Sequence, residues 1–180
     1  ERYRRELWPS KSRYERIFGA VAIAALLGGW LTDLSVLGDT PLTFALLGLR
    51  ATQAACVVPM IVGARRMERP RWQDAVRLLA VAAVPALFIL IFTLKPTTIQ
   101  VQGWSMVVTW FVVSLGVRAP FLGKVAALGA TYVLYLAHLA YLTSKLGDAY
   151  AKPNELVTIG LCCGFAAFFG AWYAHRNEQA

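Results

Sequence analysis

Charged residues are scarce in this chain. Only 16% of its 180 residues are Asp, Glu, Lys or Arg, whereas 58% are hydrophobic and the mean hydropathy is +0.53. A water-soluble globule of this length cannot bury so much apolar surface, which argues against a soluble domain and favours an integral membrane protein. The chain also has no initiator Met and no cleavable signal pattern, so we expect a piece of a longer protein.

Recognisable enzyme motifs are absent as well. The chain has no GxSxG, HExxH, Walker or GxGxxG motif, so we expect no catalytic residues and no cofactor here. Its three cysteines lie in apolar runs, and the adjacent Cys162 and Cys163 would point in different directions on a helix, which argues against a metal site. The two histidines, His138 and His175, differ in predicted height by most of the membrane and cannot share one haem iron.

The sequence does contain six long apolar runs. Crossing about 30 Å of hydrocarbon takes about 20 helical residues, and no run shows the alternating period of a barrel strand. We therefore expect an all-α integral membrane bundle of six helices over residues 17–174, followed by the start of an exit helix over 175–180. The predicted spans are 17–37, 41–64, 76–94, 101–117, 119–143 and 155–174.

Residues 1–16 form a predicted cytoplasmic lead-in. Its first part, ERYRRELWP, is either an amphipathic segment on the anionic inner leaflet or a frayed linker. The pattern Ser12-Arg13-Tyr14-Glu15 fits a capping box and predicts that the first helix begins near Arg13.

Basic residues predict the orientation. Of the 18 Lys and Arg residues, 14 fall on one side of the predicted spans and only Lys95, Lys145 and Lys152 on the other, with Arg50 in neither group. By the positive-inside rule both termini are cytoplasmic. The net charge of +8 is therefore a topology signal, and nucleic acid is not an expected partner.

Arg50 lies near the middle of the second predicted span, where a charge is costly and usually has a partner or a function. Asp33 precedes the turn at 37–40 by about six residues, and an outward-reaching Arg50 would cover the difference in height, so an ion pair closing the hairpin is one reading. In the other, Arg50 with Gln53 and His138 binds the anionic headgroup of an amphiphilic or carboxylate ligand that enters from outside. Both readings stay open.

Two further patterns concern the later helices. Thr131, Tyr135 and His138 share one face of the fifth helix at i, i+4 and i+7, and either line an outward-opening ligand pocket or link helices by hydrogen bonds. The sixth helix has a stripe of small residues, which allows close approach of another helix in the bundle or of a second protomer. The stripe consists of Gly160, Gly164, Ala167 and Ala171.

Several segments together carry a resemblance. They are YRRELWPSKSRYERIFG, LRATQAACVVP, FVVSLGVRAPFLGKVAALGATYVLY and FAAFFGAWYAHRNEQ. With six short helices and cytoplasmic ends, the chain resembles the amino-terminal six-helix membrane sensor domains of bacterial signalling proteins, which precede diguanylate cyclase, class III adenylyl cyclase or histidine kinase modules.

The resemblance implies a homodimeric receptor in the bacterial cytoplasmic membrane that regulates such a module through its exit helices. It supplies no ligand residues, and no catalytic module is present in this sequence. Two alternatives remain: an accessory structural subunit of a larger membrane complex, for example around pigment or lipid, and a small transporter or channel.

Overall fold

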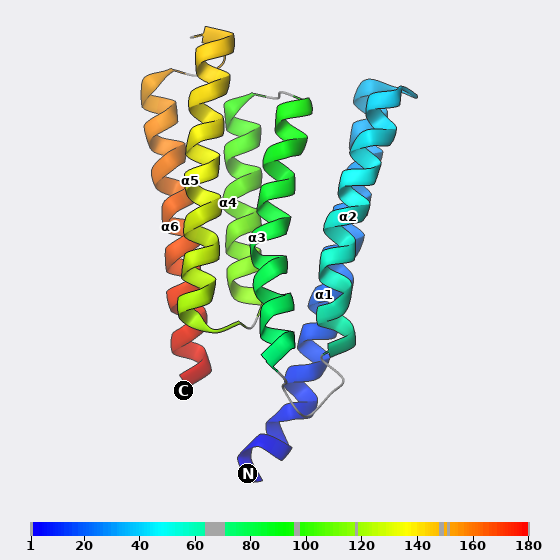
Figure 1. Ribbon diagram of the computed structural model, residues 1–180, viewed down its shortest axis with the longest axis vertical. Coiled ribbons are helices and arrows are strands. Elements are labelled where there is room, and N and C mark those ends of the chain that lie inside the picture. Colours follow the sequence, from blue (N-terminus) through cyan, green and yellow to red (C-terminus); the bar gives the residue numbers. More distant parts are fainter. Residues whose placement is uncertain are drawn as a thin grey trace. The chain divides into compact units, whose positions relative to one another are not determined.

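The computed structural model describes residues 2–63, 71–95, 98–117, 119–147, 150 and 152–179. Within these residues the chain forms six α-helices and no strand, which confirms the predicted all-α class (Figure 1). Each helix holds a stretch long and apolar enough to cross a membrane. The helices are α1 (Arg2–Leu37), α2 (Pro41–Gly63), α3 (Arg71–Leu94), α4 (Ile99–Gly116), α5 (Phe121–Leu146) and α6 (Pro153–Gln179).

The chain divides into two compact units. Unit 1 comprises Glu1–Ala80 and holds α1, α2 and the first part of α3; unit 2 comprises Val81–Ala180 and holds the rest of α3 with α4, α5 and α6. Each unit buries its own set of polar side chains, and each is described by itself below.

The start of α1 corrects one prediction. The helix begins at Arg2 and runs without a break through Ser12, so the expectation that it starts near Arg13 is wrong. The cytoplasmic position of the lead-in stays a prediction. The lead-in is rich in Arg, Glu and Lys, which are good helix formers, and a Ser with a Glu three residues on is tolerated inside a helix. The capping-box pattern was therefore not specific.

In unit 1, α1 and α2 pack against each other as a helical hairpin. The turn depends on Gly38, whose φ of +67° lies in the left-handed region that favours glycine. Thr43 donates its hydroxyl hydrogen to the Gly38 carbonyl at 2.7 Å, and Thr40 Oγ1 accepts from the Thr43 backbone N–H at 3.3 Å. The predicted turn at 37–40 is thereby confirmed.

In unit 2, α6 packs against both α4 and α5, and the three helices run side by side in Figure 1. One end of the unit, where α4 begins and α5 ends, contains Gln102; we call it the Gln102 end. The opposite end contains Lys124 and is called the Lys124 end. Fully buried large side chains fill the core between them: Met106, Trp110, Leu128, Tyr135 and Leu142.

Candidate functional site

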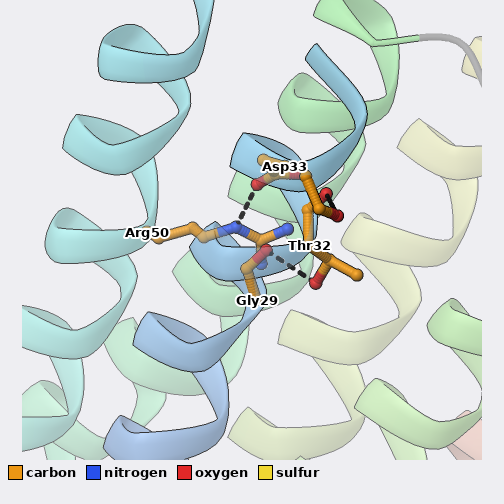
Figure 2. A network of polar contacts seen from close by, with 5 residues as sticks. Gly29, Thr32, Asp33 and Arg50 are labelled. Atoms are coloured by element: carbon orange, nitrogen blue, oxygen red, sulfur yellow. Dashed lines mark hydrogen bonds and ion pairs between the residues drawn. The ribbon is translucent and has the colours of Figure 1, made fainter. Parts of the chain in front are cut away.

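The polar centre of unit 1 is an ion pair between α2 and α1. Arg50 Nε donates to Asp33 Oδ2 at 2.6 Å, as the dashed line in Figure 2 shows, and the two side chains are only 11% and 4% exposed. A buried guanidinium is tolerated when a carboxylate neutralises it and accepts its N–H groups. The hairpin-closing ion pair predicted from the sequence is confirmed.

Gly29 makes room for this pair. A Cβ built on Gly29 would lie 2.7 Å from Arg50 Cζ, closer than real Cβ contacts allow, so the guanidinium packs directly on the α1 backbone (Figure 2). The Gly29 carbonyl meanwhile accepts from Thr32 Oγ1 at 2.9 Å. Gln53 lies three residues after Arg50 and is fully buried; its role in ligand binding stays a prediction.

A second buried ion pair in unit 1 was missed by the sequence reading. Arg77 Nη2 donates to Glu15 Oε2 at 3.1 Å, joining α3 to α1, and Arg77 Nη1 lies 3.8 Å from Asp74 Oδ1. Arg77 is one of the 14 basic residues that predict the orientation, and the structure places it inside α3 with a side chain 3% exposed. Its only sequence signal is a helical spacing of three from Asp74.

In unit 2, the predicted polar face of α5 is buried. Trp110 Nε1 on α4 donates to Thr131 Oγ1 at 3.1 Å, and the Trp110 ring meets the Tyr135 ring edge-on at 5.4 Å between centroids. The Tyr135 hydroxyl finds no hydrogen-bond partner among the residues that the structure describes. Thr131 therefore links α5 to α4 by a hydrogen bond, as the helix-linking reading expected, whereas Tyr135 packs against α4 through its ring.

His138 is the centre of a hydrogen-bond network that joins three helices and a connection. Its Nδ1 lies 3.2 Å from Thr93 Oγ1 on α3, and its Nε2 lies 3.4 Å from Gln102 Oε1 on α4. Tyr150, between α5 and α6, donates its hydroxyl hydrogen to the same Gln102 oxygen at 2.8 Å. Burial raises the pKa of Tyr150 to about 12, so this hydroxyl is a neutral donor at physiological pH. We call Thr93, Gln102, His138 and Tyr150 the His138 network.

The small residues of α6 face helices of the same chain. Tyr132 on α5 donates to the Gly160 carbonyl at 3.0 Å, and a Cβ on Gly164 would lie 3.2 Å from the same tyrosine oxygen. Ala167 and Ala171 are fully buried. The predicted close helix approach is confirmed, with the partner inside the bundle. These residues therefore give no support to a dimer interface.

At the Lys124 end, α4, α5 and α6 meet in a tight polar junction. Lys124 Nζ on α5 donates to the Ser114 carbonyl at 3.1 Å, in the last turn of α4, where helix carbonyls lack intrahelical partners. Ser114 Oγ lies 3.4 Å from the Ala167 carbonyl oxygen of α6. The ring of His175, also on α6, stacks on Phe121 at 4.4 Å. Lys124 is one of the 14 basic residues that predict the orientation, and it is almost fully buried.

The candidate ligand residues thus fall into two groups. Arg50, Asp33 and Gln53 belong to unit 1, whereas Thr131, Tyr135 and His138 belong to unit 2. Among the described residues no group of three or more His, Cys, Asp or Glu side chains is placed to hold a metal ion. No protein-family model, curated protein or solved structure matches the chain. The resemblance to signalling domains therefore rests on the sequence segments alone.

Proposed function

We propose that this chain is a membrane sensor domain in which the His138 network receives the signal and α6 carries it to a cytoplasmic cyclase or kinase module. The observation that supports this best is the position of α4. This helix contributes Gln102 to the His138 network. Twelve residues further along, its Ser114 lies beside the α6 backbone. At 1.5 Å per residue the two contacts are about 18 Å apart along one helix. A displacement of α4 at the Gln102 end can thereby be passed to α6 at Ala167.

The proposal includes an orientation. With both termini in the cytoplasm of a bacterial cell, the Gln102 end faces outward and the Lys124 end inward, so the network is reached from outside by a small or amphiphilic ligand. The buried Arg50–Asp33 pair then serves the stability of the helical hairpin. An anionic ligand at Arg50 would have to compete with Asp33 for the Nε hydrogen bond.

The orientation is tested by labelling single cysteines with a membrane-impermeant maleimide in whole cells. Cys56, Cys162 and Cys163 are first replaced by alanine. Asp39 and Arg13 are both exposed and flank the two ends of the first predicted span. Asp39→Cys should react from outside and Arg13→Cys only after the cells are opened. The reverse result would contradict the orientation and place the network on the cytoplasmic side.

The sensor class is tested by cross-linking. Cyclase and kinase modules of the kind that the resemblance implies act as pairs, so two α6 helices should leave the membrane together. Tyr173 on α6 is 47% exposed, and Tyr173→Cys in the same cysteine-free chain should form an intermolecular disulfide in native membranes. Leu122→Cys on α5, which is 80% exposed, is the control and should form little. A monomer at every α6 position would contradict the sensor and favour the accessory subunit or the transporter.

A further inference from the structure

The geometry of the His138 network indicates which of its groups donate and which accept hydrogen bonds. Thr93 Oγ1 donates its one hydrogen to the Ile89 carbonyl of its own helix at 2.9 Å, so it can only accept from His138 Nδ1. Gln102 Oε1 is an acceptor and receives the Tyr150 hydroxyl hydrogen, so it too requires a donor at His138 Nε2. Both ring nitrogens of His138 therefore face acceptors.

A neutral imidazole has one N–H and satisfies only one of these contacts. If the hydrogen is on Nδ1, the Nε2 lone pair faces Gln102 Oε1. If it is on Nε2, the Thr93 hydroxyl must leave the Ile89 carbonyl and turn to Nδ1. An imidazolium has both N–H groups and satisfies every contact at once. Proton binding therefore changes which hydrogen bonds join α5 to α3.

Of the helix ends around the ring, the carboxyl end of α3 favours a cation, whereas the amino end of α4, which holds Gln102, does not. Thr93 is in the last turn of α3, which ends at Leu94, and the carboxyl end of a helix carries partial negative charge. Other titratable groups lie on the surrounding elements at this end. They are Lys95 just after α3, Tyr135, Tyr141 and Lys145 on α5, the connecting Tyr150, and Glu155 and Cys163 on α6. Glu155 accepts from Gln100 Nε2 at 2.9 Å and from the Lys152 N–H at 3.0 Å.

We infer that His138 is a proton-binding site, and that its protonation returns the Thr93 hydroxyl to the Ile89 carbonyl and draws α3, α4 and α5 together at the Gln102 end. The sequence offers two readings for His138, ligand contact and helix linkage, and the hydrogen count adds this third role. As the input of a sensor the site rests on the proposed function; as a proton site it does not.

Imidazole ¹⁵N chemical shifts test this directly, because the chain has only two histidines. The chain in lipid nanodiscs is titrated from about pH 8.5 to 5, the range in which histidine changes charge in proteins. His175→Phe, which keeps a ring on Phe121, assigns the two signals. If that variant does not fold, Gln102→Leu assigns them instead, because it alters the surroundings of His138 alone.

We expect His138 to pass from the neutral Nε2–H tautomer to the doubly protonated ring. Thr93→Val removes the acceptor at Nδ1 and should lower the proton affinity about tenfold. Thr98→Val is the matched control, because the Thr98 side chain makes no capping hydrogen bond. A ring that stays neutral down to about pH 5 would overturn the proton site, and a neutral Nδ1–H tautomer would overturn the rearrangement of the Thr93 hydroxyl. If His138 takes up a proton but the α6 helices do not cross-link, the proton site is supported and only the sensor proposal is contradicted.

Discussion

Ser114 on α4 and Gly170 on α6 approach so closely that a Cβ built on Gly170 would lie 2.8 Å from Ser114 Cβ. Only a residue without a side chain fits there, and the close approach lets Ser114 Oγ lie within 3.4 Å of the Ala167 carbonyl oxygen. The half of α6 toward the Lys124 end thus packs directly against α4.

Gly170→Ala should push these two helices apart. We expect a loss of about 1–3 kcal/mol in unfolding free energy, the usual cost of inserting a methyl group into a packed interface. Gly129→Ala on α5 is the control: its nearest neighbour would be Phe168 Cζ at 3.9 Å, so it should be neutral or slightly stabilising. Thermal unfolding in nanodiscs measures both. Equal effects of the two substitutions would contradict the close packing of α4 on α6.

Neighbouring glycines of α1 offer a second matched pair. Gly29→Ala would drive a methyl group into the Arg50 guanidinium and should weaken the ion pair with Asp33, whereas a Cβ on Gly28 has nothing within 4 Å. We expect Gly29→Ala to lower the unfolding temperature and Gly28→Ala to raise it slightly, because alanine is the better helix former. If Gly29→Ala is as well tolerated as Gly28→Ala, the guanidinium does not pack on this backbone.

The Arg50–Asp33 pair should behave as a coupled unit. Asp33→Asn or Arg50→Gln alone leaves one charge buried without its counter-ion and should cost about 3–5 kcal/mol of unfolding free energy. The double variant should recover much of that loss, so a double-mutant cycle would give a clear coupling energy. Additive losses would show that each residue acts through other contacts. Intact stability in Arg50→Gln would instead revive the ligand reading.

Two tyrosines on α5 differ in whether the structure gives their hydroxyl group a hydrogen-bond partner. Tyr135→Phe removes a buried oxygen that has no hydrogen-bond partner among the described residues, so it should be neutral or stabilising. Tyr132→Phe removes the hydrogen bond to the Gly160 carbonyl and should cost about 1 kcal/mol of unfolding free energy. Unfolding of the two variants under one condition gives the comparison. A clear loss in Tyr135→Phe would indicate a bound water or ligand at that hydroxyl.

The sequence predicted contacts between residues that are close together along the chain. Asp33 and Arg50 are 17 residues apart across one tight turn, so helix rise alone predicts their heights. His138 is 36 residues from Gln102 and 45 from Thr93, and their contact depends on the rotation and register of three helices, which pattern does not specify. Thr93 and Tyr150 therefore went unnoticed.

The burial of charged residues near helix ends was also not predicted from the sequence. Arg77 and Lys124 lie near the ends of the predicted spans 76–94 and 119–143, and both are buried against partners on other helices. A long basic side chain at a span end has the same sequence signature whether it reaches water or a neighbouring helix. The capping-box motif at Ser12 failed for a related reason, since the residues before it are themselves good helix formers.

Transmission along α4 is the central claim, and pulsed EPR distances between spin labels at Leu122 on α5 and Tyr173 on α6 test it most directly. Both positions are exposed, and both lie toward the Lys124 end of unit 2. Gln102→Leu removes the acceptor shared by His138 and Tyr150, whereas Gln100→Leu, two residues away, removes only an exposed contact with Glu155. We predict that Gln102→Leu shifts the Leu122–Tyr173 distance by about 1–2 Å, the usual size of a helix shift, and that Gln100→Leu leaves it unchanged. Identical distances in the wild-type chain and both variants would contradict the account.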